Sequence, residues 1–193
     1  MRIDRRTSMA LSVCIALATA GTVVTIASPS FAETSVMVGG AAMYPSKTIV
    51  ENAVNSKDHT TLVAAVKAAG LVDTLNGAGP FTVFAPTNEA FAKLPAGTVD
   101  TLVKPENKQM LTTILTYHVV PGHLTAADLR KAVKDGKGKA MLKTVQGEDL
   151  TVEEKGGKLE IIDAKGGVSM VTIPDVLQSN GVIQVVDTVL MPK

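Results

Sequence analysis

Two of the three histidines of this 193-residue chain lie in one short segment, residues 116–123, which reads TYHVVPGH. Imidazole changes its charge near neutral pH and is a common metal ligand, so this segment raises the question of a metal site or a proton-transfer site. A metal site needs three or four ligands, but no Asp, Glu or Cys occurs between residues 107 and 127. If the segment is a strand, His118 and His123 also point to opposite faces, unless the Pro121-Gly122 turn reorients them. The spacing therefore predicts no metal site.

The surroundings of His118 favour packing over chemistry. This residue follows an apolar helix pattern and precedes Val119 and Val120, which predicts a buried, neutral imidazole that is hydrogen-bonded to the backbone or to a polar side chain. Tyr117 has the same context, and its hydroxyl needs a partner if the ring is buried. We expect the Tyr117-His118 segment to be a strand that anchors the preceding helix to the core. Contact with a binding partner, or catalysis with a distant carboxylate, remains an alternative role for His118.

Short motifs that mark the common catalytic and phosphate-binding sites are missing from the sequence. It contains no G-x-S-x-G, no P-loop, no G-x-G-x-x-G and no H-E-x-x-H. We therefore predict that the protein is not an enzyme, that it uses no cofactor, and that it has neither catalytic residues nor a metal site.

The first half of the sequence has the apolar periodicity of helices, and these helices must position the Tyr117-His118 pair. The expected helices are one with Ile49, Val50 and Val54 that is capped by Ser46, one with Leu62, Val63 and Val66 that ends before Gly70, a short one from Thr87 through Leu94, one after Pro105 with Met110, Leu111, Ile114 and Leu115, and one from Ala126 to about Val133 that is capped by Thr125.

From Lys139 onward the pattern changes to short runs rich in β-branched residues, which are typical of strands. Gly156-Gly157 and Asn180-Gly181 are hairpin signals, because these residues accept positive φ angles. The expected strands cover residues 81–84 in the first half and residues 150–153, 159–162, 168–173 and 182–190 in the second half. A helix-rich half followed by a strand-rich half favours an α+β fold with a mostly antiparallel sheet.

Residues 1–32 have the pattern of a cleaved signal peptide. Three arginines precede an apolar run, and Ser30-Phe31-Ala32 suits a cleavage site. We expect a flexible leader over residues 33–43 and one domain over residues 44–193. Cleavage removes three Arg, one Asp and the only Cys, so the net charge changes from +1 to −1 and no disulfide can form. With no second apolar span, this composition predicts a periplasmic or extracellular protein that binds no nucleic acid and does not insert stably into a membrane.

Three segments together resemble the fasciclin domain. Residues 81–91 (FTVFAPTNEAF) match its first signature box, Tyr117-His118 matches its tyrosine–histidine motif, and residues 180–192 (NGVIQVVDTVLMP) match its second box. Their order and spacing suit one complete domain, and the whole sequence looks like the small, secreted, single-domain bacterial fasciclin proteins. The resemblance implies a wedge-shaped β-sandwich of mostly antiparallel strands with several packed α-helices.

The resemblance also implies a function, namely cell adhesion or another interaction role without catalysis. In some animal relatives, integrin recognition has been assigned to the Tyr-His region and to a Glu-Pro-Asp-Ile-Met segment. In this sequence Ile173 takes the place of that Glu, and Gln184 stands where the second box often has His. We expect a monomer that binds a protein or a component of a cell surface or matrix. The implied partner-binding residues are Tyr117, His118, Pro174, Asp175, Val176 and Leu177.

Two alternatives stay open on the sequence alone. A periplasmic carrier of a small apolar or acidic ligand would need an apolar pocket between the helices and the sheet. A hydrolase that uses His118 would need an open cleft in which this imidazole lies beside an Asp or Glu.

Overall fold

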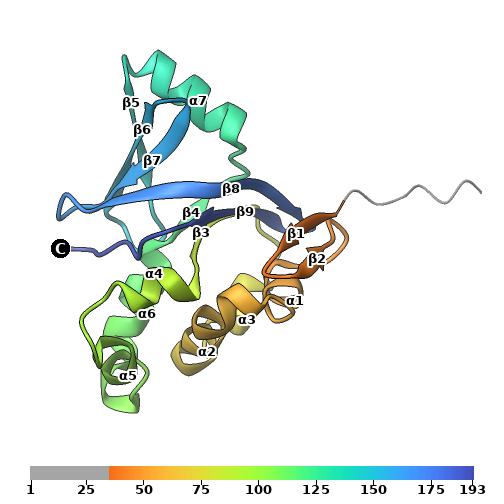
Figure 1. Cartoon of the computed structure of the whole chain (residues 1–193), viewed down its shortest axis with the longest axis vertical. Helices are drawn as coiled ribbons and strands as arrows, with labels where there is room; N and C mark the ends of the chain where they lie inside the picture. The colour runs from red at the N-terminus through yellow and green to blue at the C-terminus, as the bar shows by residue number, and fades with distance from the viewer. Residues whose placement is uncertain (1–34) are drawn as a thin grey trace, which may run out of the picture. The chain divides into compact units, whose positions relative to one another are not determined.

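The computed structural model describes residues 35–193, which contain both helices and strands (Figure 1). The α-helices are α1 (Ile49–Ala53), α2 (Thr60–Ala69), α3 (Val72–Leu75), α4 (Asn88–Ala92), α5 (Thr98–Leu102), α6 (Lys108–Tyr117) and α7 (Ala126–Asp135). Two short 3-10 helices, η1 (Lys57–His59) and η2 (Pro105–Asn107), directly precede α2 and α6. Within residues 35–193, no helix combines the length and the hydropathy of a membrane span. The predicted signal peptide lies outside the described residues.

Threonine side chains start three of these helices. Thr87 and Thr125 accept backbone hydrogen bonds at the N-termini of α4 and α7, as predicted. Helix α1 differs from the prediction, because its N-cap is Thr48 and not Ser46. The Thr48 hydroxyl accepts from the N–H of Glu51, and the Glu51 carboxylate accepts from the N–H of Thr48. This reciprocal pair is a capping box, which fixes the start of the helix two residues later than expected.

Seven strands form one sheet in the order β4-β3-β9-β8-β7-β6-β5. They are β3 (Phe81–Pro86), β4 (Val119–Pro121), β5 (Lys139–Lys143), β6 (Asp149–Lys155), β7 (Lys158–Ile162), β8 (Val168–Gln178) and β9 (Gly181–Val186). The pairing of β3 with β9 is parallel, and the other pairings among these strands are antiparallel. The prediction of an α+β fold with a mostly antiparallel sheet is confirmed.

The long strand β8 joins two parts of this sheet. Residues 168–170 pair with β7, and the strand pairs with β9 from Val171 onward. Figure 1 shows β5, β6, β7 and α7 on one side of β8 and helices α1 to α6 on the other. The two outer strands approach each other, because the N–H of Val145 donates to the carbonyl of Val119 at 2.8 Å just beyond the end of β5. The two layers of the expected β-sandwich are therefore two parts of one nearly closed sheet.

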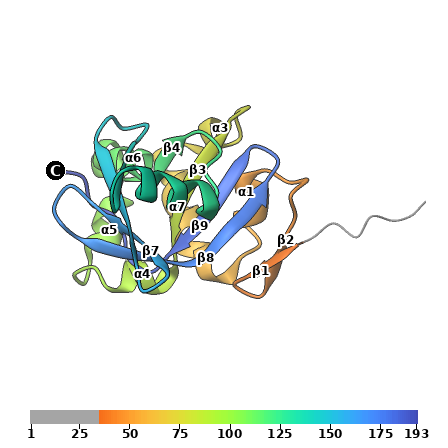
Figure 2. The same ribbon diagram turned by 90° about the horizontal axis from the view of Figure 1, so that it is seen from above.

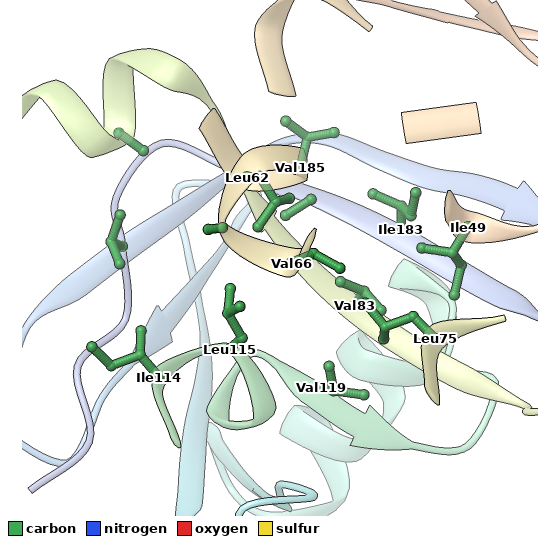
Figure 3. Packing of buried hydrophobic residues seen from close by; sticks show 14 of the residues in the cluster. Ile49, Leu62, Val66, Leu75, Val83, Ile114, Leu115, Val119, Ile183 and Val185 are labelled. Carbon is green, nitrogen blue, oxygen red and sulfur yellow. The ribbon is translucent and has the colours of Figure 1, made fainter. Parts of the chain in front are cut away.

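Strands β3 and β9 are buried on both faces and contribute to two hydrophobic clusters. Val83 belongs to a first cluster with the helices α1 to α6, whereas Phe84 belongs to a second cluster beneath α7. Successive side chains of a strand point to opposite faces, which explains why these two strands are nearly continuous apolar runs. Figure 3 shows the first cluster around Val83, with Val66 of α2 and Leu115 of α6.

Residues 36–43 form a separate antiparallel pair, β1 (Val36–Val38) and β2 (Ala41–Met43). This differs from the flexible leader expected over residues 33–43. Val38 and Met43 are buried in the first cluster, and their burial holds the pair in place. Gly39 and Gly40 both have positive φ, which a two-residue hairpin turn of this kind requires. Strand β2 contacts α1 and β8 (Figure 2).

Candidate functional site

Tyr117 and His118 lie at the C-terminal end of α6. Tyr117 is the last residue of the helix, His118 is its C-cap, and β4 begins only at Val119. The prediction that this pair lies in a strand is therefore wrong. Tyr117 is three residues after Ile114 and extends the buried stripe of α6, so the helix continues to this point.

The imidazole of His118 connects α6 to the C-terminal segment of the chain. Its Nδ1 lies 2.8 Å from the carbonyl oxygen of Ile114, and its Nε2 lies 3.0 Å from the backbone nitrogen of Leu190. A carbonyl only accepts and a backbone N–H only donates, so Nδ1 carries the proton and Nε2 is the acceptor. The backbone N–H of His118 bonds to Leu115 instead of Ile114. The side chain thus takes the place that a backbone N–H has in a regular helix.

Burial sets the protonation state of His118. The residue is 2% exposed, and this loss of solvent lowers its pKa to about 4, although the Ile114 carbonyl and the charge of Asp163 act in the opposite direction. At neutral pH the ring is uncharged, and both of its nitrogens are engaged by backbone groups. The packing prediction for His118 is confirmed, and the ring offers no lone pair to a metal and no free base to a substrate.

Tyr117 makes a second connection from the same helix end. Its hydroxyl accepts from the N–H of Ala164 at 2.9 Å and donates to the carbonyl of Asp149 at 3.3 Å. The ring is fully buried in the second cluster, and burial raises the pKa of the hydroxyl. The hydroxyl therefore stays protonated and ties α6 to β6 and to the turn after β7. The packing prediction for Tyr117 is also confirmed.

His123 lies apart from this pair. It is exposed in the loop between β4 and α7, whereas His118 is buried. Across residues 35–193, no group of three or more His, Cys, Asp and Glu side chains is arranged to hold a metal ion. The two histidines of the TYHVVPGH segment therefore share no site.

Asp175 is an irregular position in β8. Its φ angle is 56°, in the left-handed region that non-glycine residues seldom adopt. The pairing register with β9 shifts between Ile173 and Val176, so the strand bulges at this point. The Oδ1 atom of Asp175 accepts from the N–H of Ala126 at 2.6 Å. Since Ala126 is the first residue of α7, the bulge attaches β8 to the positive end of this helix.

Gln184 fixes the bulge, a role that the sequence did not indicate. This residue of β9 is fully buried. Its Nε2 donates to Oδ1 of Asp175 at 3.0 Å and to the carbonyl of Leu124 at 3.2 Å, and its Oε1 accepts from the N–H of Asp175 at 3.1 Å. The available signal was a polar side chain within an apolar strand, because such a side chain must find partners when it is buried.

The six implied partner-binding residues divide by burial. Tyr117, His118 and Val176 are buried, Asp175 is half-buried, and Pro174 and Leu177 are exposed. A partner that docks on this surface would touch Pro174 and Leu177 directly. Tyr117 and His118 bond to other parts of the chain, and only the bonds of Asp175 hold the bulge itself. The role of all six residues in binding stays a prediction.

Comparison with known sequences gives relatives that match most of this chain. The family model of the fasciclin domain matches residues 57–192. The chain is 51% identical over 160 residues to Protein sll1483 of Synechocystis sp., and the match covers 83% of this chain and 82% of that protein. It is 38% identical over 163 residues to the cell surface glycolipoprotein MPB83 of Mycobacterium bovis, with 80% of this chain and 64% of that protein covered.

Comparison with solved structures gives a similar fold. A FAS1 domain pair from the insect cell adhesion molecule fasciclin I matches with a TM-score of 0.68 and 23% sequence identity. The match covers 83% of this chain and 58% of that chain. At this identity the likeness concerns the fold, and it agrees with the architecture described above.

Proposed function

The chain belongs to the fasciclin domain family, and from this we propose that it is a non-catalytic interaction module that binds a protein or cell-surface partner outside the cytoplasm. The side chains that are best suited to acid–base chemistry already make hydrogen bonds within the fold. Tyr117 uses its hydroxyl, and His118 uses both ring nitrogens, on backbone groups. Recognition then depends on the shape of an exposed surface.

The fixed bulge of β8 is the main support for this role. Pro174 and Leu177 flank it and are exposed, Leu177 to 41%. Between them, Asp175 is held by its own N–H and by two bonds to its carboxylate. A surface already held in one conformation loses little conformational entropy on binding. Exposed apolar side chains on such a surface supply the area that a partner buries.

Two observations support a location outside the cytoplasm. Residues 1–32 have the charge and hydropathy pattern of a signal peptide. One relative, MPB83, is a cell surface glycolipoprotein by name. A secreted single domain with a rigid, partly apolar surface is suited to contact other molecules of the cell envelope.

The role of the β8 surface is tested by comparing the wild-type protein, purified from the cell that produces it, with two variants. The variant Leu177→Glu places a charge where an apolar contact is expected, and Met141→Glu is the matched control. Met141 is 71% exposed on β5, three strands from β8 in the sheet order. Each immobilised protein is exposed to solubilised envelope, to whole cells and to matrix, and the retained components are identified.

We expect the wild type and Met141→Glu to retain the same components, and Leu177→Glu to lose them while unfolding at the same urea concentration. Equal retention by all three proteins would exclude the β8 surface as the binding site. A wild-type protein that retains nothing from envelope, cells or matrix would contradict the interaction role itself.

A further inference from the structure

The turn between β6 and β7 places two lysines directly opposite each other. Lys155 ends β6, Lys158 begins β7, and only Gly156 and Gly157 separate this last pair of the register. Both lysine side chains are exposed, and within residues 35–193 neither takes part in an ion pair. Like charges at directly opposite positions destabilise an antiparallel pair of strands. The hairpin is therefore less stable than the same hairpin with an uncharged pair at its end.

The carboxylates nearest to this lysine pair are engaged by other cations. The carboxylate of Glu153 lies 2.8 Å from Nζ of Lys139, and that of Glu154 lies 3.5 Å from Nε of Arg130. Glu160 occupies a position diagonal to the lysine pair, at which Cα atoms are about 7–8 Å apart. The repulsion between the two lysines is therefore only weakly compensated by the fold.

A third lysine near this turn has a backbone conformation that lysine seldom adopts. Lys137 follows Gly136, the C-cap of α7, and its φ angle is 57°. Glycine is the usual residue at such a left-handed position after a helix. Strand β5 begins two residues later at Lys139, which pairs with Glu153 near the end of β6, so Lys137 lies at the same end of the sheet as the β6–β7 turn (Figure 1). A strained residue on the surface points to a function rather than to packing.

These features form one positive region, which we call the lysine tip. Six cations and four carboxylates belong to it, which gives a net charge of +2. The cations are Arg130, Lys134, Lys137, Lys139, Lys155 and Lys158, and the carboxylates are Asp135, Glu153, Glu154 and Glu160. The chain without residues 1–32 has a net charge of −1. The lysine tip is therefore a positive region on a chain that is otherwise negative.

We propose that the lysine tip binds an acidic polysaccharide. The negative groups of the polymer lie between the lysines and remove their mutual repulsion. A lysine ammonium group is a flexible point charge, so it attracts such groups without requiring a fixed geometry. This tolerance suits a polymer whose charges repeat along a flexible chain.

The composition of the lysine tip argues against other anionic partners. Residues 134–139 and 153–160 contain no aromatic side chain to stack on bases, and their one large apolar side chain, Leu159, is buried. A membrane would be entered by exposed apolar side chains, and a folded protein would bury them at the centre of an interface. A hydrated polymer needs neither.

The lysine tip is separate from the β8 surface of the proposed interaction role. The first residue of α7, Ala126, is bonded to Asp175 of β8, whereas the lysine tip begins in the last turn of this helix. A helix of 10 residues is about 15 Å long. The two surfaces therefore lie at opposite ends of α7, and the lysine tip adds a second binding surface to the protein.

The test measures binding of polygalacturonate to the purified protein by titration calorimetry at low and high salt. We expect saturable binding that high salt weakens, because exposed charges are screened. Fully methyl-esterified polygalacturonate, which has the same sugar chain without the charges, should not bind. The double variant Lys155→Gln with Lys158→Gln removes both charges at similar side-chain length and should weaken binding about threefold or more.

A second readout separates binding from a structural role of these lysines. Lys137→Gly removes one charge and suits the left-handed φ angle, so it should also weaken binding. This variant and the double variant should unfold at the same or a higher urea concentration than the wild type, because each removes an unfavourable feature. If both variants instead lose stability, the lysines have a structural role and the proposal is wrong.

Two control variants show whether the effect belongs to the lysine tip. Lys104→Gln with Lys108→Gln removes two exposed charges near the start of α6 and should not change binding. Leu177→Glu on the β8 surface should also bind the polymer like the wild type, which separates this proposal from the interaction role. Equal binding by the wild type and the Lys155/Lys158 double variant would overturn the assignment. So would equal binding of the methyl-esterified polymer, no binding of polygalacturonate, or tighter binding to phosphatidylglycerol vesicles or duplex DNA.

Discussion

The Nε2 atom of His118 accepts a hydrogen bond from the backbone N–H of Leu190, 72 residues further along the chain. Asp163 makes a similar connection, because its Oδ2 accepts from the N–H of Met191 at 3.0 Å. Both bonds hold the segment that follows β9 and that lies outside the sheet. The C-terminal segment is thus attached by side chains that reach it from other elements.

Replacing His118 with Ala should lower the free energy of unfolding by about 2–4 kcal/mol. The substitution leaves the Ile114 carbonyl and the Leu190 N–H buried without partners, and it creates a cavity. His118→Gln keeps an acceptor for Leu190 and should cost less. Urea unfolding followed by circular dichroism measures both values. Equal losses for the two variants would show that the bond to Leu190 contributes little.

The stability of the protein should fall as the pH falls from about 6.5 to about 4. His118 has a pKa of about 4 in the folded protein and about 6.5 when unfolded, so the unfolded chain binds the proton more readily in this range. The stabilisation is complete above the unfolded pKa and is lost as the pH approaches the folded pKa. The difference in pKa corresponds to about 3 kcal/mol. His59, whose pKa is also lowered by burial, adds to this loss.

The measurement for this pH effect is urea unfolding at about pH 7, 5.5 and 4 for the wild type and for His118→Gln, at constant ionic strength. The variant should lose less stability between these pH values. The same loss in both proteins would assign the effect to other groups.

Tyr117→Phe should lower the free energy of unfolding by about 1–3 kcal/mol. The change leaves the ring in place but removes the partner of the Ala164 N–H and of the Asp149 carbonyl. Tyr44→Phe is the matched control, because Tyr44 is an exposed tyrosine at the surface. The control should change stability by less than about 0.5 kcal/mol. Thermal and urea unfolding measure both variants, and an equal effect at the two positions would contradict the role of the Tyr117 hydroxyl.

Asp175 and Gln184 should be energetically coupled. Asp175→Ala removes the acceptor for Ala126 and Gln184 and should cost about 1–3 kcal/mol. Asp175→Asn keeps one oxygen and tolerates the left-handed φ angle, so it should cost less. A double-mutant cycle with Gln184→Ala should give a coupling energy of about 0.5–3 kcal/mol. Strictly additive losses would mean that the two side chains stabilise the bulge independently.

The sequence predicted those elements of the fold that a local signal decides. Thr87 and Thr125 cap helices because their hydroxyls bond to backbone groups three residues away. Asn180-Gly181 was predicted as a turn between strands, and β9 begins at Gly181. The buried, neutral state of His118 followed from its apolar neighbours.

Features that depend on distant partners could not be predicted in the same way. The Asn180 side chain accepts from the N–H of Ile49 and donates to the carbonyls of Leu75 and Gly77, which are all more than 100 residues away. The hydrogen bond from the Leu190 N–H to His118 also joins residues that are far apart in the sequence.

The parallel pairing of β3 with β9 also determines the order of events during synthesis. These two strands are neighbours in the middle of the sheet, although β4 to β8 lie between them in the chain. Contacts between residues far apart in sequence form slowly, since a long loop must be closed first. The centre of the sheet cannot assemble until Gly181–Val186, close to the C-terminus, has been translated. The chain should therefore reach its native sheet more slowly than a domain whose central strands are adjacent in sequence.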